Sequence, residues 1–155
     1  MVTEWQVRKA SVRDVDFVVK MIEAAARAGK FHSDTPSTEQ FRKFAFEDPP
    51  RDYMLFVAQH EDEVIGYVDV RVRRGVGLLL GLFVKTAFRN KGVGTALMGK
   101  VMEHFTRKAC HKVRLEAFLD NCEAIDFYRR QGFETEGFLR KDEERRDTVI
   151  MSKFV

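Results

Sequence analysis

A glycine-containing segment, residues 89–94 (RNKGVG), separates an apolar run from a helical stretch and constrains the fold more than any other part of the chain. The apolar run, residues 78–84, predicts a buried strand, and the spacing of apolar side chains over residues 95–109 predicts an amphipathic helix. Gly92 and Gly94 let the backbone pass close to a ligand, and the first N–H groups of a helix have no carbonyl partners of their own. Because the helix dipole also attracts negative charge, the segment indicates a strand, loop and helix unit that binds phosphate.

The spacing within this loop excludes two common phosphate-binding motifs. A Walker A loop needs GxxxxGK followed by Ser or Thr, and a dinucleotide fingerprint needs GxGxxG with an acid about 20 residues later. The loop has neither pattern. Arg89-x-x-Gly92-x-Gly94 instead resembles the (Q/R)xxGx(G/A) loop of the GNAT superfamily of N-acetyltransferases, whose backbone amides bind the pyrophosphate of acetyl-CoA.

A second motif follows in the order that this family requires. Residues 113–120 (VRLEAFLD) predict a strand, and residues 121–133 (NCEAIDFYRRQGF) follow it directly. This segment resembles the family's succession of a strand, an Asn, a helix, a Tyr and a Gly-Phe pair, which is Gly132-Phe133 here. The two motifs together cover residues 78–133.

Length and composition predict one globular domain over residues 1–155. A chain of this length can bury roughly 70% of the surface that its unfolded form exposes. Hydrophobic residues make up 45% and charged residues 33%, which argues against a disordered chain. No apolar run approaches the ~20 residues of a membrane span, and residues 1–5 (MVTEW) have neither the basic start nor the apolar core of a secretory signal. We therefore expect a cytoplasmic protein without a membrane partner.

Charge and cysteine content argue against nucleic-acid and metal partners. The 24 acidic residues are interspersed with 27 basic ones, so the net charge of +3 implies only a weak preference for polyanions, which CoA would meet as well as RNA. The arginines within residues 71–74 and 145–146 lack interleaved aromatics or a nucleic-acid-reading motif. Cys110 and Cys122 have a spacing that suits neither zinc nor disulfides. We expect reduced thiols, no metal and no nucleic-acid partner.

Periodicity and turn residues predict strands and helices in the order β-α-α-β-β-β-α-β-α-β-β. This order matches the GNAT fold, an α/β (α+β) architecture with a central mixed, mostly antiparallel sheet of about seven strands flanked by about four helices. The pattern Ser37-x-x-Gln40 predicts a capped start for the second helix. The predicted strands are residues 5–9, 55–60, 64–72, 77–84, 113–120, 133–141 and 148–155, and the first three predicted helices are residues 11–28, 38–46 and 93–109.

The strand at residues 77–84 has almost no polar side chains, which predicts a central strand covered on both faces. The resemblance implies that it pairs in parallel with the strand at residues 113–120. In this family the two strands separate, and the pantetheine arm of the cofactor lies in the gap and borrows backbone hydrogen bonds from the first strand. The resemblance places Phe83, Val84 and Lys85 at that position.

The resemblance also implies that acetyl-CoA binds the glycine loop as a cosubstrate, mostly through backbone N–H groups. Arg89 and Lys91 would add long-range attraction, and both positions also suit ordinary surface charges. Asn121 matches the asparagine that bonds the pantetheine arm, and it also suits the N-cap of the following helix. The predicted cofactor residues are Phe83, Val84, Lys85, Arg89, Asn90, Lys91, Gly92, Val93, Gly94, Thr95, Asn121 and Tyr128.

Acetyl transfer to an amine requires a deprotonated nucleophile, stabilisation of the oxyanion and a proton for the departing thiolate. Because the thioester is already activated, direct attack in a ternary complex is sufficient, and proximity alone supplies roughly 7–11 kcal/mol of the barrier. Tyr128 matches the tyrosine of the family that acts as the acid, whose hydroxyl can protonate the CoA sulfur. Its position alone also suits a partly buried aromatic on an amphipathic helix.

Glu116 is the predicted base, because it belongs to a Leu-Glu pair similar to that of bacterial ribosomal-protein N-terminal acetyltransferases. A solvent-facing glutamate paired with Arg114 suits the same position. The strand at residues 78–84, which supplies the base in some relatives, contains no acid. Asp69 and ordered water are therefore alternatives, and Asp69 is expected to be a solvated or paired strand residue. Cys122 is expected to be inert, because no histidine lies nearby in sequence to activate it.

These features predict an acetyl-CoA-dependent N-acetyltransferase whose acceptor is a primary amine. The similarity at Glu116 favours the α-amine of a protein or peptide, and a small-molecule amine such as a polyamine, an amino acid or an aminoglycoside is the alternative. In this family specificity resides in segments that correspond to residues 29–36 and 139–147. A non-catalytic acyl-CoA-binding sensor is a further alternative, against which Glu116 and Tyr128 argue. Homodimerisation through the C-terminal strands is compatible with the sequence.

Overall fold

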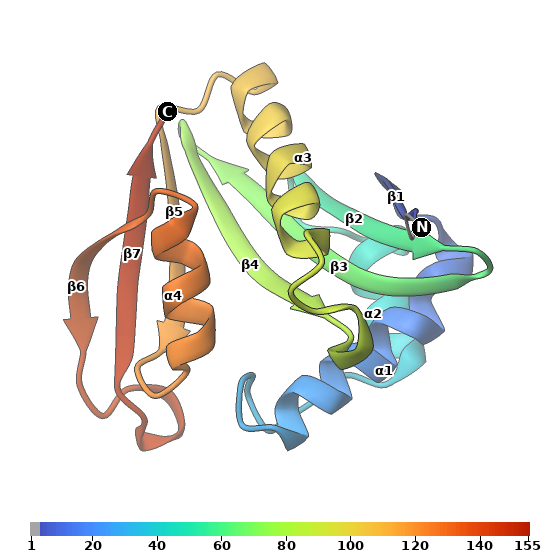
Figure 1. The fold of residues 1–155 in the computed structure, drawn as a ribbon, viewed down its shortest axis with the longest axis horizontal. Coiled ribbons are helices and arrows are strands. Elements are labelled where there is room, and N and C mark those ends of the chain that lie inside the picture. Colours follow the sequence, from blue (N-terminus) through green and yellow to red (C-terminus); the bar gives the residue numbers. More distant parts are fainter. Residues whose placement is uncertain (1–3) are drawn as a thin grey trace.

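The computed structural model describes residues 4–155, so the prediction for residues 1–5 lies partly outside the described residues. The described chain forms a seven-stranded sheet with the strand order β1-β2-β3-β4-β5-β7-β6 (Figure 1). The predicted order of elements is confirmed. The strands are β1 (Gln6–Lys9), β2 (Tyr53–His60), β3 (Glu63–Arg73), β4 (Val76–Val84), β5 (Lys112–Phe118), β6 (Glu134–Leu139) and β7 (Thr148–Phe154), and the α-helices are α1 (Val15–Arg27), α2 (Thr38–Arg42), α3 (Val93–Arg107) and α4 (Cys122–Arg130).

The sheet opens between β4 and β5, which run parallel, whereas the other described neighbours are antiparallel. The two strands pair only over residues 76–79 and 112–115. Beyond these residues they diverge, and the molecule takes the shape of a V with β4 in one arm and β5 in the other (Figure 1). Both the predicted parallel pair and its separation are confirmed.

The middle of β4 departs from the prediction of a strand covered on both faces. The register with β3 pairs Asp69 with Gly81 but Val70 with Leu79, which leaves Leu80 as the extra residue of a β-bulge. The Leu80 side chain is 49% exposed, because the bulge lies where β4 leaves β5. One face of β4 therefore borders open space at this point instead of a packed layer.

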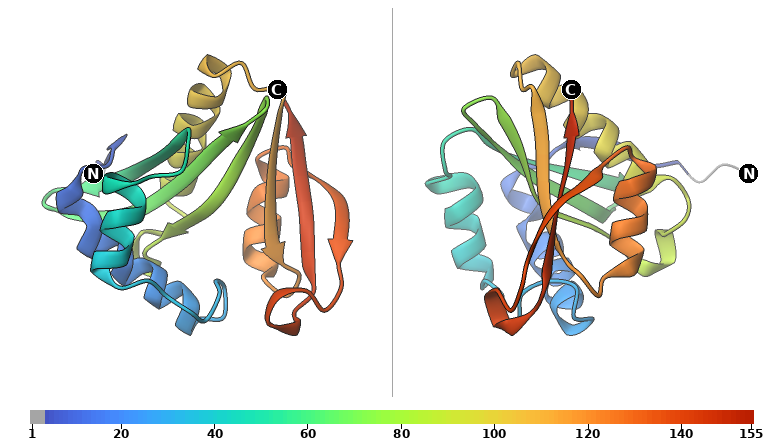
Figure 2. Two further views of the ribbon diagram at one scale, coloured as in Figure 1. Left: turned by 180° about the vertical axis from the view of Figure 1, so that it is seen from behind. Right: turned by 90° about the vertical axis from the view of Figure 1, so that its left-hand side faces the viewer.

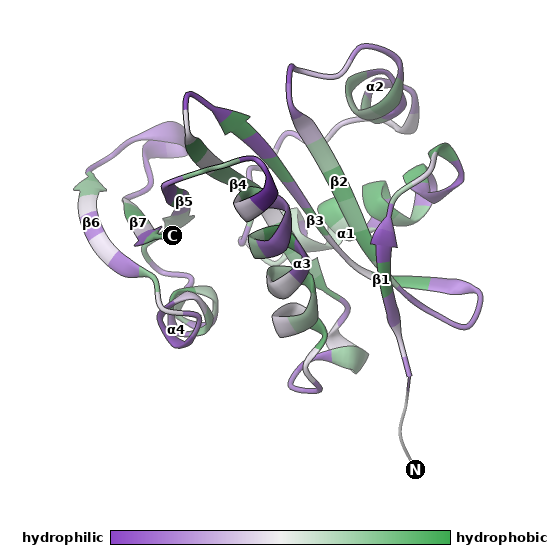
Figure 3. Ribbon diagram, turned by 90° about the horizontal axis from the view of Figure 1, so that it is seen from above, coloured by the Kyte–Doolittle hydropathy of each residue, from purple (hydrophilic) through white to green (hydrophobic). Residues whose placement is uncertain are grey.

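Helices cover the two faces of the sheet, and alternation along β2 shows how the faces divide. Phe56 and Ala58 pack into a core with α3 and α4, whereas Leu55 and Val57 pack into a second core with α1 and α2. Figure 3 shows α3 and α1 on opposite sides of the sheet. None of the helices in residues 4–155 is both long and apolar enough to cross a membrane.

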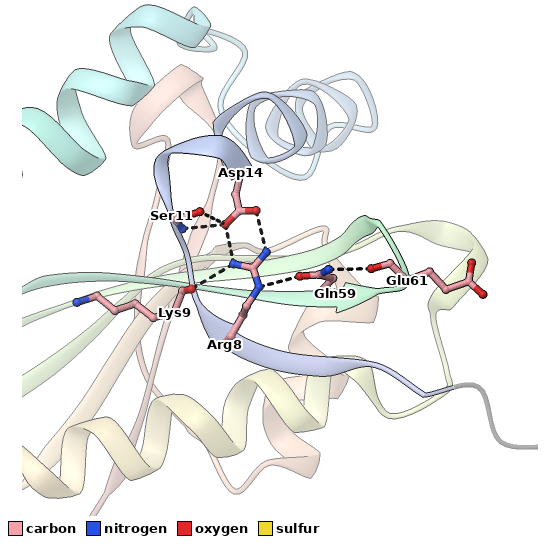
Figure 4. A network of polar contacts seen from close by, with 6 residues as sticks. All are labelled: Arg8, Lys9, Ser11, Asp14, Gln59 and Glu61. Carbon is pink, nitrogen blue, oxygen red and sulfur yellow. Dashed lines mark hydrogen bonds and ion pairs between the residues drawn. The ribbon is translucent and has the colours of Figure 1, made fainter.

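A partly buried ion pair joins β1 to the start of α1 (Figure 4). Two nitrogens of Arg8 donate to the Asp14 carboxylate at 2.8 and 2.9 Å, and the Ser11 N–H donates to it at 2.8 Å. Burial alone would raise the pKa of Asp14, but the hydrogen bonds from Arg8 and Ser11 hold it below its ordinary value. The pair therefore fixes the angle at which α1 leaves the sheet.

The second helix begins as predicted, with reciprocal capping bonds. The Gln40 N–H donates to Ser37 Oγ at 3.1 Å, and the Ser37 N–H donates to Gln40 Oε1 at 2.8 Å. The helix ends as α2 at Arg42 and continues as a π-helical turn over Lys43–Glu47. This helix and α1 flank the connection that borders the site described below.

Candidate functional site

The glycine loop leads from β4 into α3, as predicted, and each of its glycines has a separate structural reason. Gly92 has φ 90°, a left-handed conformation that suits a residue without a side chain. A Cβ at Gly94 would lie 3.2 Å from the Phe127 ring, so this glycine permits the close approach of α4. The first backbone bond of α3 runs from the Ala96 N–H to the Gly92 carbonyl at 3.0 Å. The N–H groups before it remain available to an anion.

A cavity of about 210 Å³, the loop cavity, lies between the end of β4, the glycine loop and α4. It brings together most of the residues predicted to bind the cofactor, and their roles stay predictions. Leu82, Phe31 and Phe127 also line it, and the sequence analysis did not include them. The predicted residues that line the cavity are Phe83, Val84, Arg89, Asn90, Gly92, Gly94, Thr95, Asn121 and Tyr128.

Three predicted cofactor residues do not line this cavity. Lys85 donates its N–H to the Ile65 carbonyl at 2.8 Å, so this group is already occupied by β3. Val93 is buried in the core, and Lys91 Nζ lies 5.8 Å from the centre of the Phe88 ring. The structure therefore does not bring Lys85, Lys91 or Val93 side chains to the cavity.

Strand alternation explains why Leu82 lines the cavity although it was missed. The bond between Lys85 and Ile65 fixes which peptide groups of β4 point toward β3. The groups of Val84 and Leu82 then point away from β3, toward the gap, because a β-strand alternates its hydrogen-bonding direction. The Val84 carbonyl does so, and it accepts a bond from Arg89 Nε at 2.9 Å.

Arg89 supports the loop rather than facing the cavity as a free charge. Besides its bond to the Val84 carbonyl, its guanidinium lies 5.1 Å from the centre of the Phe83 ring and 3.6 Å from Glu123. These contacts tie the glycine loop to β4 and to α4. The predicted long-range attraction by Arg89 stays a prediction.

Asn121 caps α4, as one of its two predicted roles requires. Its side-chain carbonyl accepts the Ala124 N–H at 3.3 Å. The side-chain NH₂ group makes no hydrogen bond with any residue in the described range. Asn121 also borders both cavities of the site, so this free donor is placed to meet a ligand.

A second cavity of about 360 Å³ lies next to the first, on the side of the open sheet. We call it the acidic cavity, because Asp34, Asp69, Glu116, Asp142 and Glu143 line it. Its apolar walls come from the β4 bulge, the connection between α1 and α2, and β5. Tyr128 lines both cavities and therefore lies at their junction.

Tyr128 combines burial with access to the two cavities. Its side chain is 7% exposed and packs edge-on against Phe127 and Phe133, with ring centres 5.5 and 5.9 Å away. Burial raises the pKa of its hydroxyl above the ordinary value, so the group keeps its proton at neutral pH. A neutral phenol at a cavity junction can donate a proton to a leaving group in either space.

Glu116 lies on β5 opposite Ile150 and lines the acidic cavity together with Tyr128. Its side chain is exposed, and no ion pair links it to Arg114 or to any other residue of the described chain. Glu116 is therefore solvent-facing, as in the alternative, but it is not paired with Arg114. A carboxylate without a partner at this position can accept a proton from an amine.

Asp69 was expected to be a solvated or paired strand residue, and the structure shows it buried and paired with a neutral hydroxyl. Its side chain is 8% exposed, and the Tyr53 hydroxyl donates to Oδ2 at 2.8 Å. Burial raises its pKa to about 6, although bonds from Tyr53 and the Gly81 backbone partly oppose this. Simple alternation could not reveal the burial, because it depends on the bulge at Leu80 and on the helices that cover this face.

A set of contacts between two loops, the clasp, borders the acidic cavity, and its residues His32 and Glu143 line that cavity. His32 Nε2 lies 3.0 Å from Glu143 and Nδ1 lies 3.2 Å from Glu144, whose carboxylate also accepts the Ser33 N–H at 2.9 Å. Arg146 adds a 2.7 Å bond to the Gly29 carbonyl. Figures 1 and 2 show the two connections, between α1 and α2 and between β6 and β7, at the same end of the molecule.

The clasp joins the two segments that were predicted to determine specificity. It also covers Phe118, because the Arg146 guanidinium stacks 3.5 Å from the ring centre and His32 meets the ring edge-on at 5.2 Å. Cys122, at the start of α4, is exposed and lines neither cavity. Its predicted inertness stays a prediction.

Comparisons with known proteins agree with this geometry. Residues 18–133 match the model of the Acetyltransferase (GNAT) family. An N-alpha-acetyltransferase from Sulfurisphaera tokodaii is 26% identical over 152 residues, which cover 88% of this chain and 84% of that protein. A ribosomal-protein-alanine N-acetyltransferase from Brucella melitensis superposes with a TM-score of 0.82 at 21% identity, over 97% of this chain and 99% of that chain. The PaiA N-acetyltransferase from Thermoplasma acidophilum, solved with coenzyme A, gives 0.78 at 17% identity, over 98% and 99%.

The chain belongs to the GNAT family of acetyltransferases, because the family model matches well over half of its length. The solved structures confirm the predicted fold along nearly the whole chain. The enzyme class that follows is an N-acetyltransferase, as predicted.

Proposed function

We propose that this protein transfers an acetyl group from acetyl-CoA to a primary amine, with both substrates bound at once. The observation that carries the proposal is the position of Tyr128 at the junction of the loop cavity and the acidic cavity. The structural neighbour that was solved with coenzyme A supports a CoA thioester as the donor. The loop cavity would hold the pyrophosphate and pantetheine, and the acidic cavity would hold the amine.

The residues that would hold acetyl-CoA are mostly backbone groups. The free N–H groups at the start of α3 suit the pyrophosphate. The peptide groups of Leu82 and Val84 and the side-chain NH₂ of Asn121 border the space for the pantetheine arm. The bound cosubstrate supplies an activated thioester, so no covalent intermediate on Cys122 is needed.

The transfer would need two proton movements, and the site offers one group for each. The amine nitrogen attacks the thioester carbonyl and the C–S bond breaks, while Glu116 accepts the amine proton directly or through water. Tyr128 donates its proton to the thiolate of CoA. Both side chains line the acidic cavity, so one acceptor can reach both.

Two acceptor classes are supported by different observations. The similarity to an N-alpha-acetyltransferase from Sulfurisphaera tokodaii and to a ribosomal-protein-alanine N-acetyltransferase from Brucella melitensis favours the α-amine of a protein or peptide. The acidic cavity favours a small amine, because its volume is about 360 Å³ and five carboxylates line it. The lining of this cavity therefore supports the small amine.

The test is CoA release from acetyl-CoA over a panel of peptide α-amines, lysine peptides, polyamines, amino acids and aminoglycosides, with acetyl-CoA binding measured in parallel by calorimetry. Turnover with at least one amine class supports the proposal. Binding of acetyl-CoA without turnover of any amine would instead favour the acyl-CoA sensor. Absence of acetyl-CoA binding would contradict the assignment of the loop cavity.

A further inference from the structure

We propose that the acidic cavity binds a small amine with a second cationic group, and that Asp69 is the counter-ion for this second group. The inference rests on the proposed acetyl transfer, since one nitrogen of the acceptor must reach Glu116 and Tyr128. It adds the substrate class, a diamine or polyamine, and it adds Asp69 as the residue that selects it.

The first observation is that Asp69 is a buried carboxylate without a cation. Its hydrogen-bond donors are the Tyr53 hydroxyl at 2.8 Å and the Gly81 backbone, which are both neutral. No lysine, arginine or histidine of the described chain forms an ion pair with it. A buried carboxylate is costly without an opposite charge, so a bound ammonium would compensate a charge that the protein leaves open.

The second observation is a pair of tyrosine hydroxyls without partners in the lining of the acidic cavity. Tyr67 is 2% exposed and Tyr128 is 7% exposed, both line the acidic cavity, and neither hydroxyl bonds to any residue that the structure describes. A Cβ at Gly81 would lie 3.0 Å from Tyr67 Oη and 3.1 Å from Asp69 Oδ1. Glycine at this position therefore keeps open the space where these two oxygens converge.

These oxygens suit the donors of an ammonium group. An alkylammonium carries up to three N–H donors, and the site offers the Asp69 carboxylate and the Tyr67 hydroxyl as acceptors. Burial, Asp69 and Tyr128 all raise the pKa of Tyr67, so its hydroxyl keeps its proton. A chain that spans from Asp69 past Tyr67 would bring its other nitrogen to Tyr128.

The remaining charges of the cavity favour a cation and oppose a free carboxylate. Five carboxylates line the cavity, against Lys30 and His32. Lys30 lies 3.6 Å from Glu123, and His32 is held between Glu143 and Glu144 in the clasp. An amino acid would place its own carboxylate among these groups without a free cation to receive it, so the lining selects against that acceptor class.

The size and walls of the cavity fit a short aliphatic chain. Its volume of about 360 Å³ is at the small end of ligand pockets, and the clasp residues His32 and Glu143 belong to its lining. Leu80, Phe31 and Phe118 supply apolar surface between the carboxylates. Methylene groups can lie against these walls while the two nitrogens reach oxygen acceptors at each end.

The experiment compares putrescine with butylamine, which has the same carbon chain and one amine fewer. Butylamine cannot form the proposed buried charge pair with Asp69. We therefore expect the native kcat/KM to be at least about tenfold higher for putrescine than for butylamine. In Asp69→Asn this ratio should fall to within about twofold of unity. Asp62→Asn, the same change at an exposed turn between β2 and β3, should keep the native ratio.

Thermal melting checks that Asp69→Asn is folded. If the variant does not fold, the ratio of kcat/KM for putrescine to that for butylamine in the native enzyme still tests the inference. A native enzyme that turns over butylamine or a peptide α-amine as well as putrescine would overturn the inference and leave the proposed acetyl transfer intact. So would a putrescine preference that survives in folded Asp69→Asn. Absence of turnover with every amine would overturn the proposed function itself.

Discussion

The two cavities that meet at Tyr128 are built in different ways. The centre of the loop cavity is one short segment, residues 89–94, where glycine permits a left-handed turn and a close helix contact, and β4 and α4 complete its walls. The acidic cavity depends on side chains from β3, β4, β5 and two distant connections. The space proposed for the cofactor therefore centres on a local sequence motif, whereas the space proposed for the acceptor arises from the tertiary structure.

The largest expected effect is at the junction of the two cavities. Tyr128→Phe keeps the ring in the core and removes the proton, so we expect kcat to fall by about a hundredfold or more. The dissociation constant for acetyl-CoA should stay within about twofold of the native value, because the variant keeps the aromatic ring and leaves the backbone groups proposed for the cofactor unchanged. Steady-state CoA release and calorimetry measure the two quantities. Unchanged turnover would remove Tyr128 from the mechanism.

The buried charge of the acidic cavity should be visible in stability. The pKa of Asp69 is raised to about 6 from an ordinary 3.8, so the ionised carboxylate destabilises the fold. This destabilisation is absent below about pH 4, grows as the pH rises, and is complete above about pH 6. Asp69→Asn should therefore raise the free energy of unfolding by an amount on the order of 2 kcal/mol at pH 8.

Denaturant unfolding at pH 8 and at pH 4 measures this difference. The gain of Asp69→Asn over the native protein should disappear at pH 4, where the native carboxyl is protonated as well. Tyr53 can still donate to the amide oxygen of the variant, so its bond is not lost. An Asp69→Asn protein that is less stable than the native one at pH 8 would show that the charge is compensated within the fold.

A smaller loss is expected from the base. Glu116→Gln should lower kcat/KM by about tenfold at pH 7, and the loss should shrink as the pH rises and the amine deprotonates in solution. The control is Glu134→Gln, an exposed change at the start of β6 that lines neither cavity. The test is a pH profile of the ratio of native kcat/KM to that of Glu116→Gln. A ratio that is constant from pH 7 to pH 9.5 would exclude Glu116 as the base.

The smallest expected effect concerns the loop cavity. Gly94→Ala places a Cβ 3.2 Å from the Phe127 ring, so α4 must shift and the acetyl-CoA dissociation constant should rise several-fold. Gly99→Ala lies on the same helix with nothing within 4 Å and should leave binding unchanged while it stabilises the helix by about 0.5–1 kcal/mol. Equal binding by the two variants would contradict the role assigned to Gly94.

Sequence alone predicted the position of the glycine loop and of the cap on α4, because the relevant information is local. Gly92 with its left-handed backbone, the start of α3 and the Asn121 cap follow from residue type and spacing. The burial of Asp69 could not be predicted, because alternation along β3 assigns it to a polar face with Tyr67. Only the bulge at Leu80 and the packing of α1 and α2 turn that face into a cavity wall. The clasp joins residues 112 positions apart, which no local pattern reports.

The central claim is that the two cavities are occupied together, and a two-part ligand tests it most directly. CoA joined through its sulfur and an acetyl bridge to putrescine should bind at least about a hundredfold more tightly than CoA, because linkage makes the second binding event intramolecular. Calorimetry on the native protein measures both dissociation constants. Equal affinity for the conjugate and for CoA alone would mean that the acidic cavity does not receive the acceptor, and would contradict the account.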